Sequence, residues 1–155
     1  IDQQQKVALF MIGAGELRTA IELYIQELEI KNHLILLGEV REMAQLWHNF
    51  DCFVQPSLSE ANSLALLEAM SQGVTPVVSR VGGAIEVVQN EINGLVFESN
   101  NLVELSDSIL KLISHPESRK KLSHAARLTF ENKFQAGLMV ENYQNLYQQL
   151  LNPKK

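Results

Sequence analysis

Short apolar runs alternate with helical patterns along most of this chain of 155 residues. Strands are expected at 7–12, 33–37, 51–55, 75–79 and 95–97. Helices are expected at 17–28, 41–49, 64–72, 84–89, 102–113, 116–132 and 136–151. Strands that alternate with helices form a parallel sheet with helices on both faces. The sequence therefore predicts an α/β fold with a mainly parallel sheet.

Four polar or glycine-containing segments directly follow predicted strands. They contain Gly15, Gly38, residues 56–60 and the Gly82-Gly83 pair. In open parallel sheets, ligands bind outside the carboxyl ends of the strands. We therefore expect these segments to converge on one edge of the sheet and to form the site there.

The composition is that of an ordinary globular protein, with 46% apolar and 20% charged residues. We expect one domain over residues 1–155. The net charge of −5 argues against nucleic-acid binding and leaves no polybasic membrane patch.

The single cysteine, Cys52, lies in an apolar run, and we expect its side chain to pack in the core. A single cysteine that forms no internal disulfide fits a reducing compartment, which indicates a cytoplasmic location. The abrupt start at Ile1-Asp2 indicates a fragment of a longer protein.

Two carboxylates, Glu60 and Glu68, stand eight positions apart, and Glu68 lies in a stretch that is otherwise apolar. A helix that is apolar all round is a buried helix, and a carboxylate inside one needs a polar partner. If helix separated the pair, they would lie about 12 Å apart and roughly 80° around the axis. That suits one extended polyhydroxylated ligand better than a shared-proton dyad. In the alternative interpretation, Glu68 pairs with a Lys or Arg, or leaves the helix at its exposed edge.

The segment 56–98 carries a more specific pattern. It reads Pro-Ser, a Glu, seven residues, Glu-Ala-Met, a Pro-Val-Val strand, Gly-Gly-x-x-Glu and Asn-Gly-Leu. This pattern resembles the C-terminal donor-binding domain of GT-B retaining glycosyltransferases, family 4 (group 1), from about Val7 to about Leu150. The resemblance implies a Rossmann-like three-layer domain with about five to six strands, the C-terminal half of a GT-B fold.

The resemblance assigns roles to particular residues. Glu68 would bind the ribose hydroxyls of the donor, and Glu60 would lie by the donor sugar and the leaving diphosphate as the catalytic residue. Other substrate-binding positions would be Asn62, Ser63, Leu64, Gly15, Val40, Gly82 and Gly83. The usual Gly-aromatic-Gly after the first Glu is replaced here by Ala61-Asn62-Ser63, in which Ser63 and Asn62 are suitable helix N-cap residues.

Several of these residues also have plain structural interpretations. Gly13 and Gly15 fit a tight strand-to-helix turn as well as a nucleotide-proximal loop, and Arg18 replaces the third glycine of a dinucleotide fingerprint. The Gly82-Gly83 amides open a helix and predict an anion cradle. Glu86 is expected to favour the positive end of that helix. The four histidines have no metal-ligand spacing, and we expect them on the surface or at loop ends.

The resemblance implies transfer of a hexose, from a UDP-sugar by expectation, to a glycan or lipid acceptor with retention of configuration. No metal, other cofactor or covalent enzyme intermediate is implied. Backbone amides and an Arg/Lys pair would stabilise the leaving nucleoside diphosphate, and the departing phosphate oxygen would help deprotonate the acceptor. That pair normally lies in a Gly-Arg…Lys-Gly segment, for which this chain has no match. The partner would be an N-terminal acceptor-binding domain, and the chain alone is expected to be inactive.

Two rival interpretations stay open: one half of a UDP-sugar 2-epimerase, and a non-catalytic domain of the same fold that senses or docks. An epimerase needs an acid/base set that is not assembled in this sequence. A degenerate docking domain would tend to lose Glu68, which is present. When full length, the protein is expected in the cytoplasm, with a peripheral position at the inner face of the membrane for a lipid acceptor.

Overall fold

The computed structural model describes residues 7–152, which lie in two compact units, Ile1–Gln45 and Leu46–Lys155. Each unit contains its own parallel sheet. The chain start at Ile1-Asp2 lies outside the described residues. The expectation of one nucleotide-sugar-binding domain over 1–155 stays a prediction.

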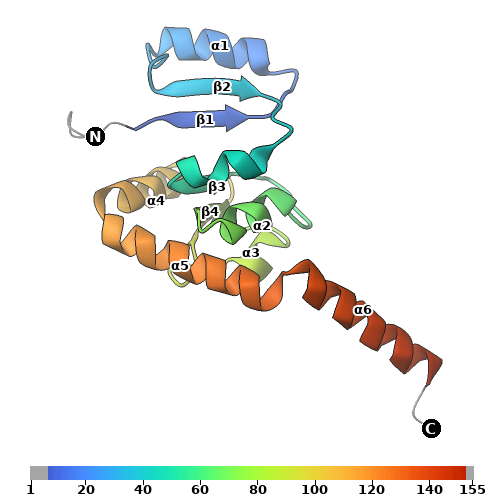
Figure 1. Cartoon of the computed structure of the whole chain (residues 1–155). Coiled ribbons are helices and arrows are strands. Elements are labelled where there is room, and N and C mark those ends of the chain that lie inside the picture. The colour runs from blue at the N-terminus through green and yellow to red at the C-terminus, as the bar shows by residue number, and fades with distance from the viewer. Residues whose placement is uncertain (1–6, 153–155) are drawn as a thin grey trace. The chain divides into compact units, whose positions relative to one another are not determined.

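Unit 1 is a strand–helix–strand motif. Strands β1 (Leu9–Ile12) and β2 (Leu34–Gly38) pair in parallel and are connected through α1 (Arg18–Glu27), which runs alongside them in Figure 1. The turn after β1 is fixed by a hydrogen bond of 2.8 Å from the Gly13 N–H to the Gly38 carbonyl. Gly13 has φ of +129° and Gly38 has φ of +71°, conformations that favour glycine.

The prediction of a helix at 41–49 is wrong. The segment instead forms two one-turn 3₁₀ helices, η1 (Met43–Gln45) in unit 1 and η2 (Trp47–Asn49) in unit 2. Trp47 is 4% exposed and packs edge-on against Phe50 and Phe53. Packing of this one large ring decides the local structure more than helical spacing does, and short 3₁₀ pieces are typical of such connectors.

Unit 2 holds a three-stranded parallel sheet in the order β3 (Cys52–Gln55), β4 (Thr75–Ser79) and β5 (Leu95–Phe97). Its helices are α2 (Leu64–Ser71), α3 (Ala84–Val87), α4 (Leu102–Ser114), α5 (Pro116–Lys133) and α6 (Ala136–Leu151). The strand β4 is buried along its whole length, as expected for the central strand of a parallel sheet.

Neighbouring residues of β4 face two separate core clusters. Val78 packs with residues of α2, α3 and α5, whereas Val77 packs with β5, α4 and the first half of α5. Helices therefore cover both faces of this sheet, and the predicted α/β class with parallel strands is confirmed. The five described strands are divided between two sheets.

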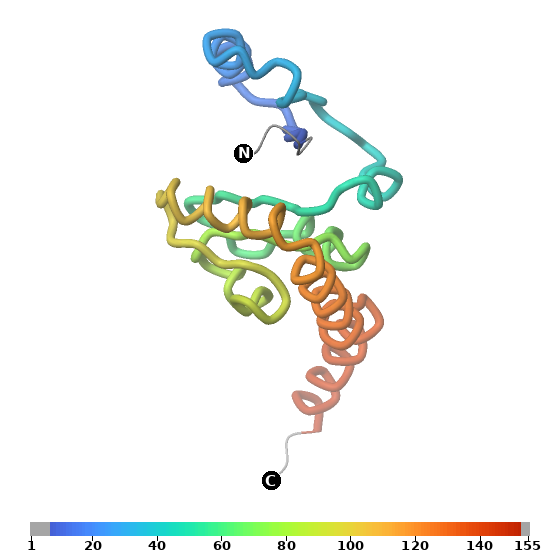
Figure 2. The backbone as a smooth tube through the Cα atoms, turned by 90° about the vertical axis from the view of Figure 1, so that its left-hand side faces the viewer, coloured from blue at the N-terminus to red at the C-terminus, as the bar shows by residue number. Residues whose placement is uncertain are grey.

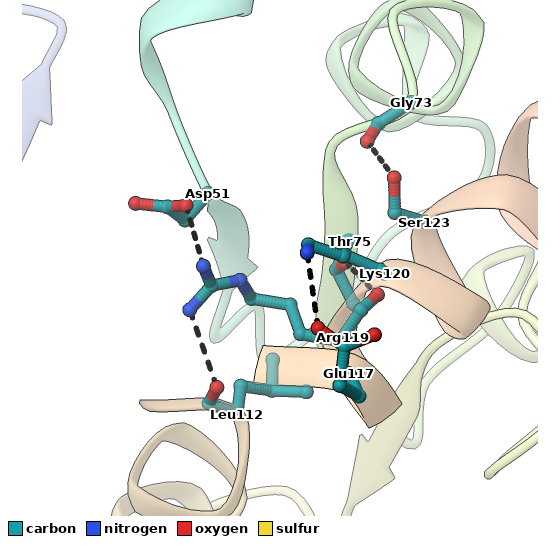
Figure 3. A network of polar contacts seen from close by, with 8 residues as sticks. All are labelled: Asp51, Gly73, Thr75, Leu112, Glu117, Arg119, Lys120 and Ser123. Atoms are coloured by element: carbon teal, nitrogen blue, oxygen red, sulfur yellow. Dashed lines mark hydrogen bonds and ion pairs between the residues drawn. The ribbon is translucent and has the colours of Figure 1, made fainter. Parts of the chain in front are cut away.

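Polar contacts around Arg119 tie α5 to the sheet (Figure 3). The guanidinium pairs with the Asp51 carboxylate at 2.9 Å and donates to the Leu112 carbonyl at 3.3 Å. The Arg119 carbonyl accepts a hydrogen bond of 3.2 Å from the Thr75 hydroxyl. One residue of α5 thus contacts α4, β4 and the residue that precedes β3.

Helix α6 leads away from the three-stranded sheet, as both views show (Figures 1 and 2). None of its residues is buried. Its exposed apolar side chains fall at helical spacing and include Met139, Val140, Tyr143, Leu146, Tyr147 and Leu150. Within residues 7–152, no helix has both the length and the apolar character needed to cross a membrane.

Candidate functional site

The Glu60 backbone is held by the glycine turn that follows β4. The Gly83 N–H donates a hydrogen bond of 3.0 Å to the Glu60 carbonyl. A Cβ built on Gly82 would lie 1.9 Å from that oxygen, and one on Gly83 would lie 1.9 Å from the Ala61 carbonyl oxygen. Both positions therefore require glycine, and Gly82 also has φ of +36°. The loop that contains Glu60 (residues 56–63, the Glu60 loop) follows β3. The structure brings this loop and the glycine pair together, as predicted for segments that follow neighbouring parallel strands.

The same contact uses one of the two amides of the predicted anion cradle. The Gly83 amide is already used within the chain, and the Ala84 N–H donates to the Val81 carbonyl at 3.1 Å. The helix that follows, α3, has only four residues. The close approach of two backbone segments explains this glycine pair. Glu86 lies in the first turn of α3, where we expected a carboxylate at the positive helix end.

The Glu60 side chain is also held. The Gln55 Nε2 amide donates a hydrogen bond of 2.9 Å to Glu60 Oε2, and the pair is partly buried. Gln55 is the last residue of β3, and its own carbonyl and that of Ser57 accept from the Ser79 hydroxyl at 3.4 Å and 2.6 Å. Sequence reasoning placed Gln55 only as a strand residue. The signal that it carried was a polar amide at the end of an apolar run.

The expectation that Glu68 lies in a helix buried all round is wrong. Leu66, Ala69 and Met70 are buried, whereas the opposite side of α2 exposes its residues to solvent, Glu68 and a 69% exposed Leu64 among them. The reason is that α2 packs against the sheet and α5 with one face only. Within residues 7–152, no hydrogen bond or ion pair engages the Glu68 carboxylate, so the alternative with an exposed edge describes its position. Its carboxylate is free to meet a ligand.

The start of α2 was predicted correctly. Ser63 is the N-cap, and its hydroxyl oxygen accepts a hydrogen bond of 3.1 Å from the Leu66 N–H. Asn62 is exposed beside it. Since α2 begins at Leu64, helix does not separate Glu60 from Glu68, and the spacing estimated for a continuous helix does not apply.

The two remaining predicted site residues, Gly15 and Val40, belong to unit 1. Gly15 lies on the wall of a surface pocket of about 220 Å³, together with Gly13, Arg18 and Leu36. Sites for drug-sized ligands are usually about 300–1,000 Å³, so this pocket is too small for a whole nucleotide sugar. A Cβ on Gly15 would meet nothing within 4 Å, so this part of the chain does not require glycine there. Val40 follows β2 and is half-buried.

The Asn93-Gly94 segment has a structural role in this chain. The buried Asn93 amide accepts from the Gln89 N–H at 2.7 Å and donates to the Val87 carbonyl at 3.0 Å and to the Thr129 hydroxyl at 3.2 Å. A Cβ on Gly94 would lie 2.7 Å from both Pro76 and Val88. These contacts link the segment before β5 to α5 and to β4.

All four histidines are exposed, as expected. In the described part of the chain, no group of three or more His, Cys, Asp or Glu side chains is arranged to hold a metal ion.

Comparison with known proteins gives longer relatives that match most of this chain. It is 29% identical over 148 residues to the N-acetyl-alpha-D-glucosaminyl L-malate synthase of Bacillus anthracis, covering 95% of this chain and 39% of the relative. It is 29% identical over 138 residues to the UDP-Gal:alpha-D-GlcNAc-diphosphoundecaprenol alpha-1,3-galactosyltransferase of Escherichia coli, covering 88% of this chain and 35% of the relative. The chain thus spans about two fifths of the length of these relatives or less.

Solved structures share the fold. The Anabaena protein Alr3699/HepE in complex with UDP superposes with a TM-score of 0.85 at 23% identity, covering 92% of this chain and 41% of that one. The C-terminal domain of the group 1 glycosyl transferase LpcC of Francisella tularensis gives a TM-score of 0.72 at 20% identity, covering 78% of this chain and 64% of that one. The fold is therefore that of the C-terminal half of GT-B glycosyltransferases. A family model described as Glycosyl transferases group 1 matches residues 1–129, and the chain belongs to that family.

Proposed function

We propose that this chain is the donor-binding part of a retaining hexosyltransferase and that its donor is a UDP-hexose. One observation carries the proposal. Two carboxylates flank the first turn of α2 beside the carboxyl ends of parallel strands; Glu60 is held by Gln55, and Glu68 has no partner among residues 7–152. Ligands of open parallel sheets bind at these strand ends.

The two carboxylates have different roles in the proposal. Glu68, on the exposed side of α2, accepts hydrogen bonds from the ribose hydroxyls of the donor. Glu60 lies by the transferred sugar and the leaving diphosphate as the catalytic residue. A carboxylate accepts hydrogen bonds through two oxygens, so each can bind a pair of hydroxyl groups. Asn62, Ser63, Leu64, Gly82 and Gly83 line this region, and Gly15 and Val40 are proposed to contribute from the segments after β1 and β2.

The rest of the machinery would come from beyond this chain. The proposal includes an N-terminal acceptor-binding domain, an Arg/Lys pair on the diphosphate, and catalysis without a metal or other cofactor. The acceptor would be a glycan or a lipid-linked glycan, as supported by the diphosphoundecaprenol in the name of the Escherichia coli relative. With such an acceptor, the protein would work in the cytoplasm at the inner face of the membrane.

Among the rival interpretations, the epimerase and the docking domain share the architecture. Membership of the group 1 glycosyl transferases favours transfer over epimerisation. The docking interpretation predicts that the exposed Glu68 binds no nucleotide, and the experiment below separates it from the proposal.

The test is a titration of the chain with UDP and with UDP-glucose, followed by ¹⁵N NMR because weak binding is expected. Glu68→Ala should abolish binding of both ligands, since the contact with the nucleoside is lost in each. Glu60→Ala should weaken UDP-glucose binding more than UDP binding, because its partner is at the sugar end. Loss of one hydrogen bond to a charged group corresponds to about tenfold in affinity.

Glu141→Ala is the matched control, because Glu141 is an exposed carboxylate on α6, far along the chain from the site. It should leave both affinities unchanged. Equal losses for the two ligands in Glu60→Ala would contradict the role of Glu60. Unchanged binding in Glu68→Ala would contradict the ribose assignment.

A further inference from the structure

We infer that Gln55 is the positioning residue for the Glu60 carboxylate and thereby determines how strongly the site distinguishes a UDP-sugar from UDP. The inference rests on the proposed function of Glu60. It concerns a residue of β3 that no sequence motif marked.

The first support is geometric. The Gln55 amide holds Glu60 Oε2 at 2.9 Å, while the Gly83 N–H holds the Glu60 carbonyl at 3.0 Å. Backbone and side chain are thus fixed from two different strand ends. In the described part of the chain, no hydrogen bond engages Glu60 Oε1, so one carboxylate oxygen is anchored and the other remains for a ligand.

The amide can adopt only one useful orientation. An ionised carboxylate only accepts hydrogen bonds, so the NH₂ group of Gln55 must face Glu60. The Gln55 Oε1 atom then points elsewhere, and it is buried without a hydrogen-bond partner among residues 7–152.

That unsatisfied oxygen is the second support. A buried acceptor without a partner costs about 1–3 kcal/mol, whereas an apolar residue of similar size at this place would avoid the cost. Gln55 shares its side of β3 with Phe53, which packs against the apolar cluster under α2. Proteins break such local rules chiefly at functional sites. The hydrogen bond to Glu60 is the contribution of the Gln55 amide that offsets the cost of its unsatisfied oxygen.

A purely structural role makes a different prediction. If Gln55 only stabilised the loop, replacing it should lower stability and affect both ligands alike. If it positions Glu60, a side chain of similar volume without the amide should change stability little, because removal of the unsatisfied acceptor offsets the loss of the hydrogen bond to Glu60. Only the discrimination between UDP-glucose and UDP should change.

The experiment uses four variants of the chain: Gln55→Met, Gln55→Glu, Glu60→Ala, and Gln55→Met combined with Glu60→Ala. Each is titrated with UDP and with UDP-glucose by ¹⁵N NMR, and its melting temperature is measured. Gln55→Met should reduce the preference for UDP-glucose over UDP by roughly three- to tenfold, the equivalent of one hydrogen bond, with little change in the melting temperature. Gln55→Glu has the same shape but places a second carboxyl group against Glu60, where like charges repel unless the pair shares a proton, and it should also lose preference.

The double variant should match Glu60→Ala alone, because Gln55 acts through Glu60. A Gln55→Met variant that keeps the wild-type preference, or losses that add in the double variant, would overturn the inference while the proposed function stands. The ligand-free spectra provide a separate check, since the Gln55 side-chain NH₂ signals should shift in Glu60→Ala. If they shift and the wild-type chain binds neither ligand, the proposed function itself fails and Gln55 is left with a structural role.

Discussion

The two carboxylates of the proposed site are in opposite physical situations. Glu60 is partly buried and accepts a hydrogen bond from Gln55 at the end of β3, whereas Glu68 is exposed and has no partner in the described part of the chain. A held carboxylate has already lost side-chain entropy before a ligand arrives, and a free one must lose it on binding. This difference fits a catalytic position for Glu60 and a binding position for Glu68.

Cys52 provides a prediction at the same scale. Burial raises the pKa of its thiol, the Arg119 guanidinium opposes that shift, and the Asp51 carboxylate adds to it. Because the thiolate is the reactive form, alkylation by iodoacetamide should be slow at pH 7 in the folded chain and fast in urea. Rapid stoichiometric labelling of the folded chain at pH 7 would show that the thiol is not core packing.

The sign of the pH effect on stability follows from the same shift. The unfolded thiol releases its proton above about pH 8.5, while the folded thiol still holds it. The unfolded state is then favoured, so this contribution is fully present below that pH and is lost as the pH rises through the folded pKa. Urea denaturation from pH 7 to 10 should show a smaller decline in Cys52→Ala than in the wild-type chain.

At the scale of elements, the glycine turn after β4 is the support of the Glu60 loop. Gly83→Ala would place a Cβ against the Ala61 carbonyl, so the two backbone segments must separate. We expect a loss of about 2–3 kcal/mol in the free energy of unfolding, as for other overpacked positions, together with weaker UDP-glucose binding. Urea denaturation measures the first effect and NMR titration the second.

Gly137→Ala is the matched control, since a Cβ there meets nothing within 4 Å in helix α6. It should raise helix stability by about 0.5–1 kcal/mol and leave binding unchanged. A Gly83→Ala variant as stable as Gly137→Ala would mean that the close approach of the Glu60 loop is not part of the native fold.

Much of the element order could be predicted because the hydrophobic periodicity and the turn and capping residues indicate the same element boundaries. Strands β4 and β5 and helix α6 have the predicted bounds, and Ser63 caps α2 as its type suggests. The structure of the segment 41–49 could not be predicted, and the exposure of Glu68 was one of the alternatives that the sequence left open. Both depend on which face of an element finds a packing partner, and local pattern does not contain that information.

The site shows the same division between local and tertiary information. The spacing of residues in the sequence identified Glu60, Glu68 and the glycine pair. It also predicted that both glycine amides are available to bind an anion. The hydrogen bond from the Gly83 N–H to the Glu60 carbonyl joins the segments that follow β4 and β3, whereas the Gln55–Glu60 contact is local and involves residues that both lie at the end of β3. The Gly83–Glu60 contact depends on the parallel pairing of β3 with β4, in which Gln55 stands opposite Val78.

At the scale of the whole molecule, the chain is about two fifths of the length of its relatives or less, and we expect weak binding from it alone. Charge-assisted hydrogen bonds to Arg and Lys supply much of the affinity for a diphosphate, and the predicted Arg/Lys pair has no match here. The chain should bind UDP no tighter than about 1 mM, about −4 kcal/mol, and should transfer no sugar. A full-length protein that contains it should show tighter binding and transfer together. Low micromolar binding of UDP, or turnover of UDP-glucose by the chain alone, would refute this expectation.

The most direct test of the central claim is to map UDP-glucose on the chain by ¹⁵N chemical-shift perturbation. We predict that the largest shifts fall on the amides of residues 60–68, with Gly82, Gly83 and the Gln55 side chain also affected, and that they saturate in the millimolar range. Perturbation at Gly15 and Val40 would support their proposed contribution. An unperturbed 60–68 segment at saturating UDP-glucose, or shifts confined to surfaces such as α6, would contradict the claim that this chain binds a nucleotide sugar through Glu60 and Glu68.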